Sequence, residues 1–171
     1  MTSPGVISGW WGGLSTGEAG QALYITSEDI EKLVRSWEEC TLPRKAFTHA
    51  AHLTVAAWHL IQHSRAEATD NIRRGLQRFN AAHGVEVSPE GGYHETLTLF
   101  WIRVVASHLA AERAIPLVDL VNGLLAKHGD KNLPFEHYTR ELLFSPAARA
   151  GWVEPNLRPM PEESVSGRPM P

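Results

Sequence analysis

Histidines are the residues of this sequence whose type and spacing suggest chemistry most directly. His49, His52, His59 and His63 follow one another at spacings of three, seven and four residues, so in a helix they fall within an arc of roughly 80°. Imidazoles three or four residues apart on a helix can bind one metal ion. We predict His49 and His52 as metal ligands, and leave out His59 and His63 because the outer end of such a stripe can be solvated.

The segment from Tyr93 to Thr96 offers the additional ligands that a two-histidine helix needs, since a metal site uses three or four protein groups. Its acidic residue, Glu95, is followed by a largely apolar helical face, where a buried carboxylate requires a cation or hydrogen-bond partners. We therefore predict Glu95 as a ligand or general base. We predict His94 as a further imidazole ligand or as an acid–base group.

Nitrogen and oxygen ligands without a thiolate suit a divalent transition metal, and they do not distinguish Fe, Mn, Zn, Ni and Cu. An open coordination position would permit oxygen chemistry or metal-activated water. The first hypothesis is thus a metal-dependent enzyme, of oxidoreductase or hydrolase/lyase type, that acts on a small-molecule substrate. We expect the substrate in a pocket between helices that is walled by Trp58, Tyr93 and Trp101.

Other interpretations of the same residues stay open. His49 and His52 can be core residues, and His94 and Glu95 can cap a helix, where an early Glu favours the helix dipole. A metal-free acid–base enzyme using His94 and Glu95 is a further hypothesis. Another is a metal-free helical module whose Trp-rich leader and Pro-rich tail bind a partner protein.

Helical periodicity predicts the elements that would position these groups. Capping residues, glycines and prolines delimit predicted helices over 26–39, 49–63, 66–83, 93–113, 116–128 and 134–143, with a short turn from Pro146. The sequence shows no sustained strand alternation. We predict a single-domain, all-α bundle of about five to six helices over 26–150, a flexible leader over 1–25, and a Pro-rich, extended or disordered tail over 151–171.

Composition narrows the classes of partner and compartment. The chain has 171 residues and a formal net charge of −3, so it lacks the basic field that nucleic-acid binding uses. No apolar run approaches the ~20 residues that span a bilayer. Cys40 is the single cysteine and no Lys or Arg precedes Lys32, which favours a reduced, cytoplasmic location. The oligomeric state stays open, a homo-oligomer included.

Three stretches together resemble a family of short, uncharacterised bacterial proteins. They are Cys40–Pro43 followed by Phe47-Thr48-His49-Ala50-Ala51-His52-Leu53, then Gly92-Tyr93-His94-Glu95-Thr96-Leu97-Thr98, then Leu143–Pro146 with Gly151–Pro155. The resemblance covers roughly residues 30 to 157 and implies no substrate. It implies that the two histidine-containing segments belong to one site, and that Glu38, Tyr93 and Trp101 are pocket residues.

Overall fold

The computed structural model describes residues 23–89, 91–112 and 114–160. Over these residues it has helices and no strand, apart from an isolated bridge between Ser88 and Gly91. The elements are α1 (Ser27–Glu38), a 3-10 turn η1 (Arg44–Ala46), α2 (His49–Gln62), α3 (Arg65–Ala82), α4 (Glu95–Ala111), α5 (Leu117–His128), α6 (Pro134–His137), α7 (Arg140–Leu143) and α8 (Pro146–Ala150). The all-α prediction is confirmed.

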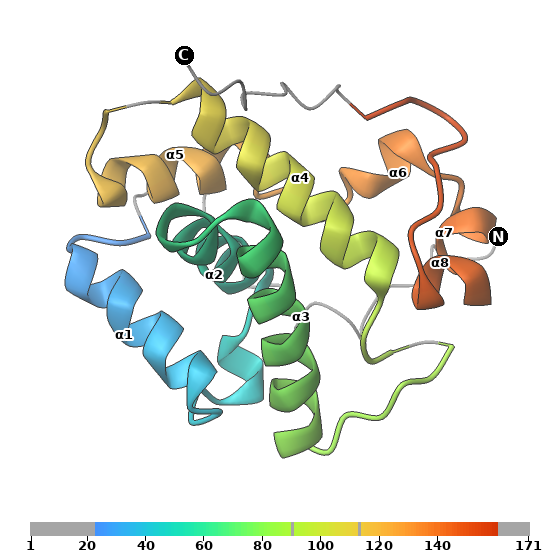
Figure 1. Cartoon of the computed structure of the whole chain (residues 1–171), viewed down its shortest axis with the longest axis horizontal. Helices are drawn as coiled ribbons and strands as arrows, with labels where there is room; N and C mark the ends of the chain where they lie inside the picture. Colours follow the sequence, from blue (N-terminus) through green and yellow to red (C-terminus); the bar gives the residue numbers. More distant parts are fainter. Residues whose placement is uncertain (1–22, 90, 113, 161–171) are drawn as a thin grey trace, which may run out of the picture.

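Helix α2 is the centre of the bundle and packs against α1, α3, α4 and α5 (Figure 1). Its first turn is capped by Thr48, whose hydroxyl accepts a hydrogen bond from the Ala51 amide, as expected of an N-cap threonine. Buried residues such as Leu53 and Val55, which are two positions apart, cover more than one face of the helix. A helix that is apolar nearly all round must lie inside the fold, and both α2 and α4 meet that condition.

A close contact fixes how α3 packs on α1. Gly75 lies inside α3, where glycine costs about 1 kcal/mol relative to alanine. A Cβ atom at Gly75 would lie 2.1 Å from the ring of Trp37, the fully buried tryptophan of α1. The glycine therefore makes room for the indole, and the local cost is offset by the burial of a large side chain.

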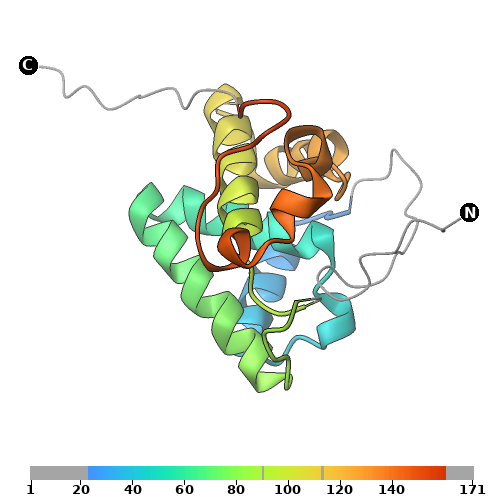
Figure 2. The same ribbon diagram turned by 90° about the vertical axis from the view of Figure 1, so that its right-hand side faces the viewer.

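The chain after α5 runs along one side of α4, and α8 packs against α4 near the N-terminal end of that helix (Figure 2). The single helix predicted over 134–143 is interrupted, because Tyr138 takes an extended conformation and Thr139 caps a new helix. The interruption lets the buried Tyr138 donate a hydrogen bond from its hydroxyl to the Val153 carbonyl oxygen, 2.9 Å away.

Residues 151–160 are non-helical and pack on the bundle. The Thr96 hydroxyl donates to the Gly151 carbonyl oxygen at 2.6 Å, and His137 Nδ1 bonds to the Arg158 carbonyl oxygen at 2.8 Å. Residues 1–22 of the leader predicted over 1–25, and residues 161–171 of the predicted tail, lie outside the described residues. The partner-binding role predicted for these segments stays a prediction. None of the helices described is long and apolar enough to cross a membrane.

The N-terminus of α4 is held by His94, which is fully buried and acts as the N-cap. Its Nδ1 accepts a hydrogen bond from the Leu97 amide at 3.3 Å, and its Nε2 lies 2.7 Å from the Leu143 carbonyl oxygen. A nitrogen that accepts from an amide is unprotonated, and a nitrogen bonded to a carbonyl carries the proton. One neutral tautomer satisfies both bonds, so His94 joins the start of α4 to the end of α7.

We expect His94→Ala to lower the free energy of unfolding by about 2–4 kcal/mol, because it removes the cap and leaves a buried carbonyl without its donor. Urea unfolding at neutral pH measures the change. His94→Asn retains a capping side chain and should lose less. Equal losses in the two variants would contradict the role of the cap.

Candidate functional site

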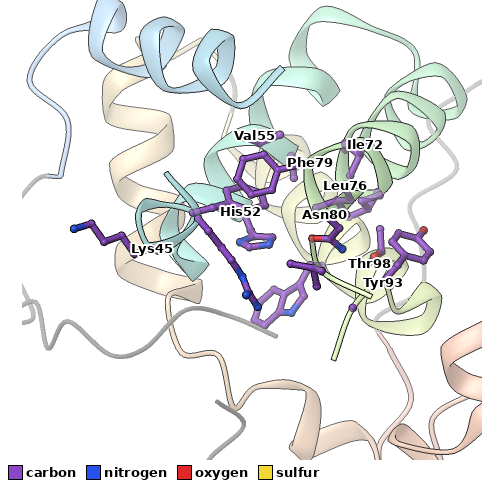
Figure 3. A pocket seen from close by; sticks show the side chains of 16 residues that line it. Lys45, His52, Val55, Ile72, Leu76, Phe79, Asn80, Tyr93 and Thr98 are labelled. Atoms are coloured by element: carbon purple, nitrogen blue, oxygen red, sulfur yellow. The ribbon is translucent and has the colours of Figure 1, made fainter. Parts of the chain in front are cut away.

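A pocket of about 450 Å³ lies between α2, α3, α4 and the segments that lead into α2 and α4 (Figure 3). Sites for small molecules typically measure 300–1,000 Å³ and have apolar walls with a few polar groups. The apolar part of the lining here is Phe47, Val55, Ala56, Ile72, Leu76, Phe79, Val85, Trp101 and Ile102. The remaining lining residues are Gly92, four neutral polar residues and two cationic residues.

His52 is the most central polar group of the pocket, and Figure 3 shows its ring inside the cavity. Its Nδ1 lies 2.8 Å from the Thr48 carbonyl oxygen, one helical turn earlier. A carbonyl oxygen only accepts, so Nδ1 carries the proton and Nε2 carries the lone pair of the neutral ring. The ring stacks on Phe47 with centroids 3.6 Å apart, and burial lowers the pKa of His52 to about 3.

The wall opposite η1 carries the other neutral polar residues, Asn80, Tyr93 and Thr98 (Figure 3). Tyr93 reaches this wall because the chain turns sharply at Gly92. Gly92 has a φ of 85°, and a Cβ there would lie 2.6 Å from the Val87 Cα. Any other residue at Gly92 would meet both backbone strain and a clash.

The Glu95 carboxylate interacts with two side chains of the fold. Its carboxylate forms an ion pair with Arg73 of α3 and accepts a hydrogen bond from the Tyr93 hydroxyl. Only 14% of the Glu95 side chain is exposed, so the guanidinium supplies the cation that a carboxylate on this face requires. Burial, together with the bond to Glu95, raises the pKa of Tyr93 and keeps its hydroxyl protonated.

His49 lies one turn before His52 on α2 and is buried, but it is not part of the pocket lining. Its ring meets the Trp101 ring edge-on, with centroids 4.5 Å apart. Burial lowers the pKa of His49 to about 4, partly offset by a hydrogen bond with the His128 backbone. The imidazole is therefore neutral at physiological pH, which is the form that binds metals.

The four predicted metal ligands thus lie in different places and contact different partners. His52 lines the pocket and His49 is buried beside a pocket wall, whereas His94 caps α4 and Glu95 pairs with Arg73. In the described part of the chain, no group of three or more His, Cys, Asp or Glu side chains is arranged to hold a metal ion. The four-residue metal site stays a prediction.

The predicted pocket residues also lie in different places. Tyr93 and Trp101 line the pocket, while Trp58 is half-buried elsewhere against the core. Glu38 is on α1, where its Oε1 lies 3.5 Å from Nε2 of the buried His59. Burial lowers the pKa of His59 to about 4, so the contact is between a carboxylate and a neutral ring.

Several lining residues have no recognisable signal in the sequence. Arg44 lies between Pro43 and the start of the helix predicted from His49, where the sequence has no periodic pattern. Asn80 lies in a helix whose polar positions resemble a solvated face. Their positions in the pocket depend on how α3 and η1 pack around α2. Periodicity gives the faces of single helices and does not give the packing of distant ones.

Comparisons of this chain with protein-family models, with curated proteins and with solved structures yield no match. The resemblance to a bacterial family stays a prediction. The interpretation of the site therefore depends on its geometry and electrostatics.

We expect the free energy of unfolding to fall as the pH is lowered from about 7.5 to about 5. Near the lower end its slope should exceed ~1.4 kcal/mol per pH unit, the value for one extra proton bound by the unfolded chain. Burial lowers the pKa values of His49, His52 and His94 to about 4, about 3 and about 4. The unfolded chain binds these protons near the ordinary value of 6.5, so the stabilisation is complete above that pH and declines below it.

Urea unfolding at several pH values measures this slope. His63→Gln, which changes an exposed histidine of the same sequence stripe, is the matched control and should leave the slope unchanged. A free energy of unfolding that is constant over this range would contradict the neutral state of the buried rings.

Proposed function

We propose that this protein binds a small, largely apolar molecule in the pocket between α2, α3 and α4. The observation that carries the proposal is the pocket itself, about 450 Å³ in volume, with apolar side chains from three helices as its walls. A cavity of this size with few polar groups suits a small molecule better than a peptide or a nucleic acid. His52 and Asn80 add polar groups that can orient the bound molecule.

The neutral protonation state of the His52 ring suits ligand binding better than it suits acid–base catalysis. A general base works best when its pKa is near the operating pH, and the pKa of His52 is about 3. A neutral imidazole with its proton held at the Thr48 carbonyl is suited to accept a hydrogen bond at Nε2. His94 and Glu95, the residues of the acid–base hypothesis, each make bonds that support the fold.

N-phenyl-1-naphthylamine, a neutral apolar fluorophore, tests the proposal. We expect its fluorescence to rise on binding to the wild-type protein, and we expect Leu76→Trp to weaken binding by about tenfold or more, because the larger side chain fills a lined wall. Fluorescence titration gives the dissociation constants.

Leu60→Trp is the matched control, because Leu60 is also a half-buried helical leucine and is not part of the lining. It should bind the fluorophore as the wild type does, with both variants folded by circular dichroism. Absence of binding to the folded wild type, or equal binding by the two variants, would reject the pocket as the site.

A metal centre at His49 and His52 is a second candidate function, and the low pKa values of both rings favour it. Both imidazoles are neutral at pH 7, as metal binding requires, and they are one helical turn apart on α2. The pair would need further ligands from substrate or solvent for a complete coordination sphere. An enzyme that binds its substrate in the same pocket would then follow.

Elemental mass spectrometry of the untagged protein tests this candidate. If it holds, the wild type contains near-stoichiometric Fe, Mn, Zn, Ni or Cu, and His52→Ala loses that metal. His63→Ala, which changes an exposed histidine of the same sequence stripe, should retain it. A wild type that stays free of metal after incubation with each ion would reject the centre.

A further inference from the structure

The charges around the pocket indicate which class of molecule enters it. The lining contains two cationic residues, Arg44 and Lys45, and no carboxylate among the residues described. Both cations are on η1, the short turn between α1 and α2, and both are exposed. The electrostatic potential at this edge of the pocket is therefore positive, although the whole chain has a net charge of −3.

Within the described ranges, neither Arg44 nor Lys45 forms an ion pair. Glu95 is not part of the lining, and its carboxylate, which accepts from the hydroxyl of the lining residue Tyr93, is already paired with Arg73. Other arginines of the bundle have partners: Arg78 donates to the Glu38 carbonyl oxygen, and Arg158 pairs with Glu136. The cations of η1 thus retain their capacity to bind an anion.

The apolar and cationic parts of the lining are on different elements. Ile72, Leu76 and Phe79 of α3 form an apolar wall, while the two cations come from the turn before α2. His52 lies between these parts (Figure 3). A molecule that satisfies both parts has an apolar body and a negative group at one end.

We propose that the ligand is an amphipathic organic anion, such as a carboxylic or sulfonic acid with an apolar ring or chain, and that Arg44 binds its acid group. This inference rests on the proposed binding function and specifies its ligand class. The planar guanidinium of Arg44 can donate two parallel hydrogen bonds to a carboxylate or sulfonate. Figure 3 shows the Lys45 amine directed away from His52, so Lys45 contributes only a longer-range attraction.

Two fluorophores that differ only in the acid group test the inference. They are 8-anilinonaphthalene-1-sulfonate and its neutral counterpart N-phenyl-1-naphthylamine. At low salt we expect Arg44→Gln to weaken binding of the sulfonate about tenfold and to leave the neutral compound unchanged. Lys45→Gln should weaken sulfonate binding about twofold. Raising NaCl to about 500 mM should remove most of the difference between wild type and Arg44→Gln, because the contact is exposed.

Arg74→Gln is the control for surface charge, because Arg74 is exposed on α3 outside the pocket lining. It should bind both fluorophores as the wild type does. Sulfonate binding that is insensitive to Arg44→Gln, or weakened equally by Arg74→Gln, would overturn the inference while binding of the neutral compound still supports the proposed function. If neither compound binds, or if Leu76→Trp weakens neither, the proposed function and the inference are both rejected.

Discussion

The two hydrogen bonds of the His94 ring determine how the second half of the protein is arranged. The first turn of a helix has amide groups without partners, and burying them inside a protein requires an acceptor at that place. A neutral imidazole provides the acceptor with one nitrogen and a donor with the other, so it also binds the chain at Leu143. Residues on either side of His94 are placed as a result, with Tyr93 on the pocket wall and Glu95 against Arg73.

Much of the fold follows from sequence pattern. The apolar stripes of α1 and α3 and the nearly all-apolar surface of α4 are read from periodicity, and the starts of α1 and α2 from the capping residues Thr26 and Thr48. The break at Tyr138 was not predicted, because it depends on contacts with the chain near Val153. Long-range contacts of this kind have no local signature.

The sequence indicates what single residues of the site require, and it does not identify the distant residues that meet these requirements. It indicates that a buried carboxylate at Glu95 needs a cation or hydrogen-bond partners, and it led us to predict a metal there, whereas the partners in the structure are Arg73 and the Tyr93 hydroxyl. Arg73 lies 22 residues earlier, on a helix whose basic residues read as a solvated face. Likewise, the spacing of His49 and His52 places them on one face of α2 and does not reveal that Trp101 packs against one ring while Phe47 stacks on the other.

The contact between Gly75 and Trp37 limits how the sequence can change over evolution. A side chain at Gly75 would occupy the volume of the indole, and a smaller residue at Trp37 would leave a void that glycine cannot fill. Each single replacement therefore lowers the free energy of unfolding, whereas a paired exchange of large and small residues preserves the total volume. Among descendants of this sequence, the two positions are expected to vary together or to stay fixed together.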